Sequence, residues 1–398
     1  MLTTGATETR LPTELLIEIF LLTQEHDHSL AEPEQVEGNS KVAMGISHVC
    51  RRWRATALGI PNLWTYSFYQ TRKARHKARF MRIQIKRSQW APLIFYLRLR
   101  EHPEDDRVRK LVEVCIGRVQ KIYIEEDCPK LALAILNRAR APRLRTLALY
   151  GPAANYHLNP SCPFPNGFGS LETFHLHRMK IDLSTIPTAV QGLTSLTLDK
   201  IPYSCMAAIL KSVARDLTSL TLGKIDATRQ DTASVILPSL HELTFNTCPT
   251  SAPRWIIPHH LKVVGLCDIN PLMLMKLDKK VGRSWAIHPL EEVEELVIRA
   301  TPRDYLPDGA YWVDRHLRNL PKAFPNVSRI NMTGHCLSPR AAQFWCAVLG
   351  ENEHGVGMFK SRWPMLKTIS VSREDVRAAL LEEFKGARED VSDMVVIA

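Results

Sequence analysis

One six-residue pattern, L-x-x-L-x-L with conservative exchanges, recurs after residue 90 and restricts the fold more than any other feature. The first seven copies start 21–27 residues apart, and the last three follow intervals of 32, 34 and 39 residues. Two copies are identical, and the similar tails DKI and GKI follow them. The copies are VQKIYI (119–124), LRTLAL (144–149), LETFHL (171–176), LTSLTL (193–198 and 217–222), LHELTF (240–245), LKVVGL (261–266), VEELVI (293–298), VSRINM (327–332) and LKTISV (366–371).

The last two apolar residues of each copy are two positions apart, so both side chains face one side of a short strand. Parallel stacking of such strands builds a continuous core that no single copy can form. The period and the motif resemble leucine-rich repeats. This resemblance implies an irregular α/β solenoid with parallel strands on the concave face and helices and turns outside, including a helix over 204–214. A generic α/β domain with leucine-rich strands is the alternative.

The repeats differ from the common form in one respect. The usual asparagine three positions after the motif is absent, and Ile201, Ile225, Cys248 and Ile269 stand in its place. We therefore expect no asparagine ladder, and we expect larger insertions or distorted repeats beyond Leu261. A segment that opens with a capping box (Ser372, Asp375) is expected to form a helix that caps the end of the stack.

Near the N-terminus, RLPTELLIEIFLLTQ (10–24) predicts a helix that begins close to Pro12. At 100° per residue, its apolar side chains from Leu15 to Leu22 spread nearly all round the axis. A helix of this kind must be buried all round. Either the rest of the chain covers it, or a partner protein covers part of it.

The stretch from Ser47 to Trp64 predicts a second helix. Val49, Cys50, Trp53 and Ala57 fall within an arc of about 100°, and the nearby arginines (Arg51, Arg52, Arg54) lie outside it. We expect this helix to end before Pro61, and Asn62 to cap a short turn that carries Leu63 and Trp64. The intervening acidic residues 25–40 predict a solvated, flexible loop.

These two segments together resemble an F-box, and most closely the F-box-like domains of fungi. Leu11-Pro12-x-Glu14-Leu15-x-x-Glu18-Ile19-Phe20 opens the motif, and Ser47-His48-Val49-Cys50-Arg51-Arg52-Trp53-Arg54 with Leu63-Trp64 closes it. An F-box is a three-helix unit that binds the Skp-type adaptor of a cullin–RING ubiquitin ligase, so the resemblance implies an adaptor and a cullin as partners. The adaptor-binding or core-contact residues that it implies are Leu11, Pro12, Leu15, Ile19, Val49, Cys50 and Trp53. Trp64 is expected to pack internally.

The segment from Arg72 to Arg87 holds eight basic residues and no acid, within a chain of formal net charge +11. We predict a solvated helix over 71–87 that links the module to the repeats; a nucleic-acid or acidic-partner site is the alternative. The sequence thus divides into a flexible N-terminus (1–10), an F-box-like module (11–67), a basic linker helix (68–90), a solenoid (91–372) and a C-terminal capping helix with a tail (373–398).

Several classes of function are not expected. The nine cysteines are scattered without a CxxC pair, which indicates reduced thiols in the cytoplasm or nucleus. No run of about 18 apolar residues and no secretory signal is apparent, so a membrane is not an expected partner. The histidine pairs His26/His28 and His175/His177 have no further ligands nominated for a metal. No nucleophile elbow or phosphate-binding glycine loop occurs, and we expect no catalysis and no cofactor.

A binding role remains. The outward positions of the predicted strands form a mixed polar face that suits protein recognition. Its candidate target-binding residues are Tyr123, Tyr150, His175, His177, Asp199, Asn246 and Arg299. We predict a substrate-recognition subunit of a Skp–cullin–F-box ubiquitin ligase, which holds an adaptor and an unknown protein target. A non-degradative adaptor-binding scaffold, or a nucleic-acid-associated protein that uses 72–87, are the alternatives.

Overall fold

The structure is a computed structural model. It describes residues 11–24, 33–71, 74–100, 102–126, 141–151, 157–158, 170–178, 180–181, 192–201, 203–223, 234–246, 256–267, 291–300, 324–334, 365–371 and 395–397. The chain divides into two compact units, residues 1–174 with 188–190, and the remainder from His175 onward. The predicted flexible N-terminus, residues 1–10, lies outside the described part.

The first unit begins with α1 (Thr13–Leu22), α2 (Pro33–Ser47), α3 (Arg51–Leu58) and the short 3-10 helix η1 (Pro61–Trp64). These elements share an apolar core, which consists of Leu16, Phe20, Ala43, Ile46, Ala57, Ile60, Leu63 and Trp64. The Trp64 indole Nε1 donates a hydrogen bond of 2.8 Å to the Ala57 carbonyl, and its ring is fully buried. The expected internal packing of Trp64 is confirmed.

Three local predictions in this region are wrong. Residues 33–40 of the expected acidic loop belong to α2, because Pro33 starts a helix and Val36 packs against the neighbouring sheet. The second predicted helix begins at Arg51 rather than before Val49, and the extended Cys50 caps it: its Sγ accepts a hydrogen bond from the Trp53 backbone N at 3.4 Å. The turn at η1 starts at Pro61 after an extended Ile60, so Asn62 does not cap it.

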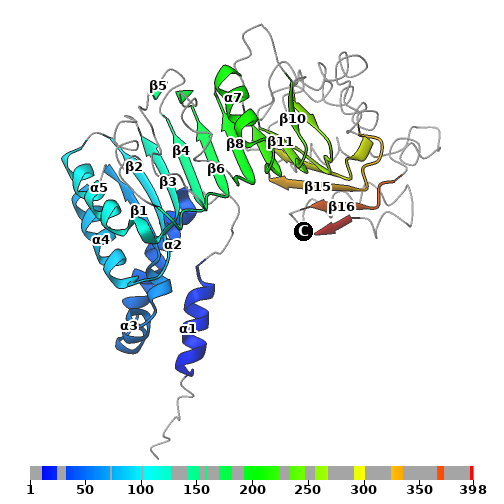
Figure 1. Cartoon of the computed structure of the whole chain (residues 1–398). Coiled ribbons are helices and arrows are strands. Elements are labelled where there is room, and N and C mark those ends of the chain that lie inside the picture. The colour runs from blue at the N-terminus through cyan, green and yellow to red at the C-terminus, as the bar shows by residue number, and fades with distance from the viewer. Residues whose placement is uncertain are drawn as a thin grey trace, which may run out of the picture. The chain divides into compact units, whose positions relative to one another are not determined.

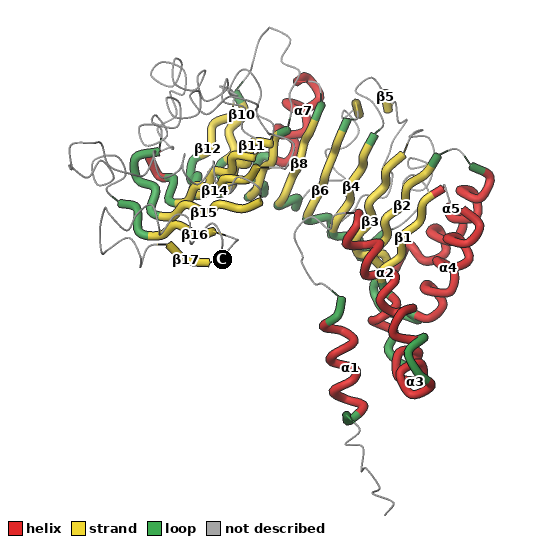
Figure 2. The backbone as a smooth tube through the Cα atoms, turned by 180° about the vertical axis from the view of Figure 1, so that it is seen from behind, coloured by secondary structure: helices red, strands yellow, loops and turns green. Residues whose placement is uncertain are grey.

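A parallel sheet follows in the same unit. Its strands are β1 (Tyr66–Gln70), β2 (Leu93–Leu99), β3 (Val119–Glu126) and β4 (Thr146–Tyr150), hydrogen-bonded in chain order. Between them lie α4 (Ala74–Arg87), α5 (Pro103–Cys115) and the 3-10 helix η3 (Ile116–Arg118). Figures 1 and 2 show α4 and α5 on one side of this sheet and α2 on the other.

The helix expected in the basic segment is therefore present as α4, but it is not a solvated linker. The Gln84 side chain accepts a hydrogen bond from Ser67 of β1 at 2.9 Å and donates one to the Ser40 carbonyl of α2 at 3.0 Å. Met81 of α4 is fully buried. The sequence analysis did not anticipate β1, whose side chains give α4 a surface to cover.

The described part of the second unit consists mainly of parallel strands in chain order. They are β8 (Ser195–Asp199), β9 (Ser219–Leu222), β11 (Glu242–Asn246), β13 (Val263–Cys267), β14 (Glu295–Ala300), β15 (Arg329–Gly334), β16 (Thr368–Val371) and β17 (Val395–Ile397). The division between the units falls within β6 (Thr173–His177). The smaller elements of the second unit are β7 (Lys180–Ile181), α7 (Tyr203–Val213), β10 (Val235–Leu237) and β12 (Ile256–Pro258), and the first unit also contains the short strand β5 (His157–Leu158).

Every copy of the L-x-x-L-x-L pattern contains a strand. The motif positions pair in register, as Leu196 with Leu220 and Leu220 with Leu243. These leucines are buried, so the predicted one-sided core and its parallel strands are confirmed. The helix expected over 204–214 is present as α7. The chain is thus a mixed α/β protein with extensive parallel sheet.

Two predictions at the C-terminal end have different outcomes. The capping helix expected after Ser372 lies outside the described residues. The segment 395–397, expected as part of a tail, is instead strand β17, which pairs in parallel with β16. Its sequence, VVI, is apolar and β-branched, which suits a strand.

Candidate functional site

An exposed apolar stripe runs along α1. The side chains of Leu11, Leu15 and Ile19 follow one another at four-residue intervals, and Leu15 is 46% exposed. On the other side of the same helix, Leu16 and Phe20 are buried in the helical core. The helix that appeared apolar all round is therefore covered by this chain on one side only. Such a stripe suits contact with another apolar surface.

The start of α3 lies beside this stripe. A terminal nitrogen of Arg52 donates a hydrogen bond to the Leu11 carbonyl, and the Trp53 ring centroid lies 5.0 Å from that of Phe20. Val49, just before the cap at Cys50, is 60% exposed. Two segments that are far apart in the sequence thus form one corner of the first unit.

The residues predicted to bind an adaptor divide into two groups. Six are exposed: Leu11, Pro12, Leu15, Ile19, Val49 and Cys50. Trp53 is half-buried and packs against the core, so its first role is internal. The sequence analysis missed Leu22 and Leu58, which are exposed apolar residues of α1 and α3. Their places in an apolar run did not distinguish them from core residues.

Among the candidate target-binding residues, Tyr123 is placed wrongly by the sequence analysis. It was expected on an open sheet face, but α2 covers that face of the first unit, and Tyr123 is buried with Val36, Phe68 and Tyr96. The ring centroids of Tyr96 and Tyr123 are 6.3 Å apart. Tyr123 is a core residue.

Tyr150 lies at the margin of this cluster. It is half-buried and packs against the same residues. Burial, with the nearby Glu125 carboxylate as a second cause, raises the pKa of Tyr150 to about 12. The phenol therefore stays neutral near pH 7 and offers a hydroxyl rather than a charge.

His175 also departs from its expected exposure. The side chain is 5% exposed, and its Nδ1 has no hydrogen-bond partner among the described residues. Burial lowers the pKa of His175 to about 4, so the ring is neutral at pH 7. A buried neutral ring is not available for target binding.

His177 and Asp199 are brought together in the second unit. The imidazole Nδ1 of His177 lies 2.5 Å from a carboxylate oxygen of Asp199. Both residues directly follow the last apolar residue of their motif copies. Asn246 and Arg299 occupy the same place in later copies, and both are exposed. Along the sheet, Asn246 pairs in register with Cys267, and Cys267 with Arg299.

Two further cross-strand pairs, one an ion pair and one a hydrogen bond, were not nominated from the sequence. Arg329 lies 3.2 Å from Glu295, and the Ser219 hydroxyl donates to Glu242 at 3.1 Å. Each pair joins adjacent strands at one position of the repeat. An alignment of the repeats on the last apolar residue of each motif copy places the two members of each pair at the same position.

The described side chains show no arrangement suited to metal binding: no group of three His, Cys, Asp or Glu residues is placed to hold an ion. Within the same ranges, no helix has both the length and the apolar character needed to span a bilayer. The α1–α3 corner and the polar sheet face are the two surfaces on which the described candidate residues gather. Comparison of the sequence with family models and with curated proteins finds no match.

Proposed function

We propose that this chain is the substrate-recognition subunit of a Skp–cullin–F-box type ubiquitin ligase. The α1–α3 corner binds the Skp-type adaptor, which joins it to a cullin, and the polar sheet face of the repeats binds a protein target. The observation that carries the proposal is the exposed apolar stripe Leu11, Leu15 and Ile19 on a helix whose other side is core. These are residues for which the F-box resemblance implies adaptor contact.

The stripe is a plausible source of binding free energy. Covering a half-exposed leucine or isoleucine side chain contributes on the order of 1 kcal/mol. Val49 adds a further exposed apolar side chain beside the start of α3. Polar groups stand at the margin, since Glu14 and Glu18 of α1 and Arg51 of α3 are exposed. An apolar centre with a charged rim is the usual composition of a specific protein interface.

The role proposed for the second unit is to hold a target near the ligase. One row of its sheet carries small polar side chains, Thr197, Thr221, Thr244 and Asn331, which are half-buried. Adaptor and target held by one chain share a high effective concentration. Ubiquitin then passes from a conjugating enzyme brought by other subunits, and this chain contributes binding alone.

The proposal is tested by capture of a purified Skp-type adaptor on the immobilised full chain. Leu15→Asp and Ile19→Asp place a carboxylate in the stripe, and each should weaken capture at least tenfold. Val114→Asp is the matched control, because Val114 of α5 is 87% exposed and lies in no proposed interface. Trp53→Asp is a poorer test, since Trp53 packs on Phe20 and its loss would also affect folding.

The wild-type chain and the control should capture the adaptor equally well. Circular dichroism should show that both stripe variants keep the wild-type helix content. Undiminished capture by a Leu15→Asp/Ile19→Asp double variant would refute the docking role of the stripe.

A further inference from the structure

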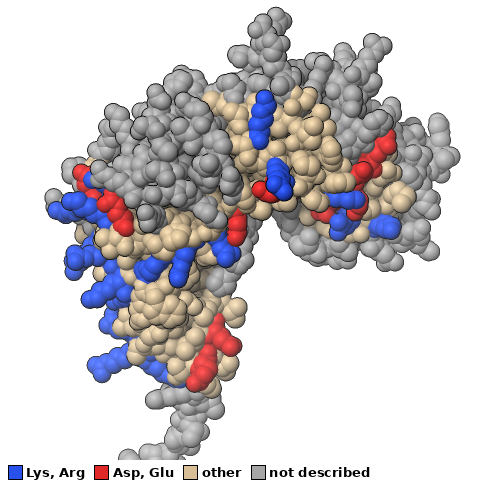
Figure 3. All heavy atoms as spheres, viewed as in Figure 1, with Lys and Arg blue, Asp and Glu red and all other residues tan. Residues whose placement is uncertain are grey.

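Basic side chains line α3 and α4 without any intervening acid. The sequences of these helices, RRWRATAL and ARHKARFMRIQIKR, contain no Asp or Glu. Figure 3 shows Lys and Arg side chains gathered along the edge of the first unit that α3 and α4 form. The sheet and α2 take up one of these charges: Lys77 lies 3.0 Å from Glu37 and 4.1 Å from the centroid of the Phe68 ring.

Arg79, Arg82 and Lys86 form the outward row. Their spacing of three and four residues places them on one face of α4, and the row is about 10 Å long. All three are exposed, and none pairs with an acid in the described part of the chain. The opposite side of α4, with Ala78, Met81 and Gln84, is buried and holds the helix backbone in place.

Arg87, the last residue of α4, lies against an aromatic ring of the helical core. The Arg87 guanidinium lies 4.3 Å from the centroid of the buried Trp64 ring, and its Nη1 is buried without a hydrogen-bond partner among the described residues. Burial, and then the charge of Arg54, lower the pKa of Arg87. The charge of Arg54 disfavours the charged form of Arg87, and a bound anion would offset that effect.

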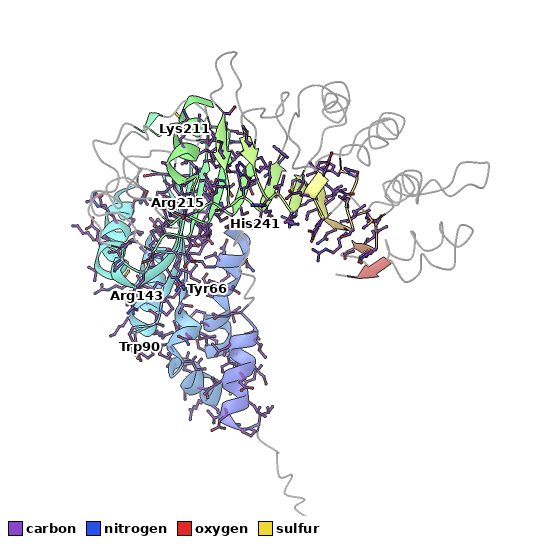
Figure 4. All side chains as sticks on the ribbon, turned by 45° about the vertical axis from the view of Figure 1, so that its right-hand side comes forward. Tyr66, Trp90, Arg143, Lys211, Arg215 and His241 are labelled. Carbon is purple, nitrogen blue, oxygen red and sulfur yellow. The ribbon has the colours of Figure 1, made fainter. Side chains whose placement is uncertain are left out.

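An exposed aromatic ring stands at the end of the row. Trp90 is 72% exposed and lies three residues after the end of α4 (Figure 4). Its neighbours Ser88 and Ala91 are buried, and the Ala91 backbone N donates to the Ser88 carbonyl at 2.8 Å. The turn therefore holds the backbone of Trp90 at the C-terminal end of α4 and leaves its ring exposed to solvent.

We propose that this α3–α4 surface binds single-stranded nucleic acid. Arg79, Arg82 and Lys86 would contact successive phosphates, Arg87 would contact a further phosphate, and Trp90 would stack on an unpaired base. Basic residues that follow a backbone, with an aromatic side chain for stacking, are the combination that single strands require. An acidic polypeptide would leave the exposed ring unused, and a duplex keeps its base faces stacked.

The test is fluorescence anisotropy of the full chain with a labelled oligothymidylate of about 20 nucleotides. Wild-type affinity should fall steeply with salt, and Arg79→Glu/Arg82→Glu/Lys86→Glu should weaken binding at least tenfold. The slope of log K against log salt should become shallower by about two, since a single strand contributes about 0.7 for each phosphate contacted. Trp90→Ala should weaken binding several-fold and leave that slope unchanged.

Lys211→Glu/Arg215→Glu is the matched control, because both residues are exposed basic side chains on and just after α7 in the second unit (Figure 4). This variant should bind as the wild type does. Equal affinity for polyglutamate, for a duplex or for anionic phosphatidylserine vesicles would overturn the assignment to single strands, as would an unchanged affinity of the triple variant. The triple variant should still capture the Skp-type adaptor, so this inference and the proposed ligase role can fail independently.

Discussion

The Nδ1 atom of His177 lies 2.5 Å from a carboxylate oxygen of Asp199, on the neighbouring strands β6 and β8. Both residues directly follow the last apolar residue of a motif copy, where the next copy has Gly223. The backbone N of Gly223 donates to the Leu198 carbonyl at 2.7 Å. Gly223 therefore lies directly against the Asp199 side chain. In three successive copies, the position after the motif is therefore histidine, aspartate and glycine, and the glycine leaves room for the aspartate side chain.

This relationship predicts the effect of Gly223→Ala. A Cβ built at Gly223 would lie 1.9 Å from Oδ1 of Asp199, so the carboxylate must move away from His177. We expect a loss of about 1–3 kcal/mol in the free energy of unfolding, as measured by urea denaturation. Gly45→Ala in α2 is the control, because nothing lies within 4 Å of its added Cβ. An equal effect at both glycines would show that Asp199 is not held in place.

The buried His175 predicts a dependence of stability on pH. Its pKa is about 4 in the folded chain and about 6.5 when unfolded, so below pH 6.5 only the unfolded chain gains the proton. The stability that this group contributes is complete above pH 6.5 and is lost as the pH falls towards 4.

Between pH 7 and 5, the wild type should therefore lose about 2 kcal/mol more than His175→Leu does. Urea denaturation of both proteins at the two pH values measures this difference. His259→Ala, at an exposed histidine, should keep the wild-type dependence. A histidine that titrates near 6.5 in the folded chain would give parallel curves for wild type and His175→Leu.

The repeats could be predicted from the sequence because each leucine pattern specifies a strand and the side that it buries. The outcome for Tyr123 differed, because its exposure depends on what covers the second side of the sheet. In the first unit that cover is α2, whose acidic, proline-containing sequence resembles a loop and whose helix is stabilised by burial of Val36. Periodicity within a strand does not contain this information.

In α1, the sequence pattern also fails to predict exposure, and here the residue concerned is exposed rather than buried. Leu15 and Leu16 are adjacent residues of the same type, yet the first is exposed and the second is in the core. Sequence pattern predicted an apolar helix here but not which side remains open. Only the placement of α3, with Trp53 against Phe20, separates the two.

The burial of Tyr123 in the core, which replaces its predicted exposure, can be tested directly. If it is a core residue rather than a target contact, Tyr123→Ala should reduce the free energy of unfolding by about 3–5 kcal/mol, the range for loss of a large buried aromatic side chain. Thr221, at the equivalent place in its motif copy, is half-buried and serves as the control; Thr221→Ala should change stability by less than about 1 kcal/mol. Thermal or urea unfolding distinguishes the two, and equal small effects would place Tyr123 at the surface.

Asp105 organises the junction between β1 and α5. Its carboxylate is buried and accepts hydrogen bonds from the hydroxyls of Tyr69 at 2.7 Å and Thr71 at 3.2 Å. It also accepts from the backbone N of Arg100 at 3.1 Å and of His102 at 3.0 Å. Burial, and then the bond to Asp105, raise the pKa of Tyr69, so the phenol remains a donor at neutral pH.

Asp105→Asn should therefore reduce the free energy of unfolding by about 2–4 kcal/mol. The amide NH2 group of asparagine would face groups that are themselves hydrogen-bond donors, and the charged acceptor would be lost. Tyr69→Phe should cost about 1–2 kcal/mol, since three donors to Asp105 remain. In the double variant the two losses should not add, because one hydrogen bond is removed by both changes. Asp106→Asn, at the exposed neighbour in the same helical turn, is the control and should change stability by less than about 1 kcal/mol. Additive losses in urea denaturation would show that Tyr69 and Asp105 act separately and that the junction is held by other contacts.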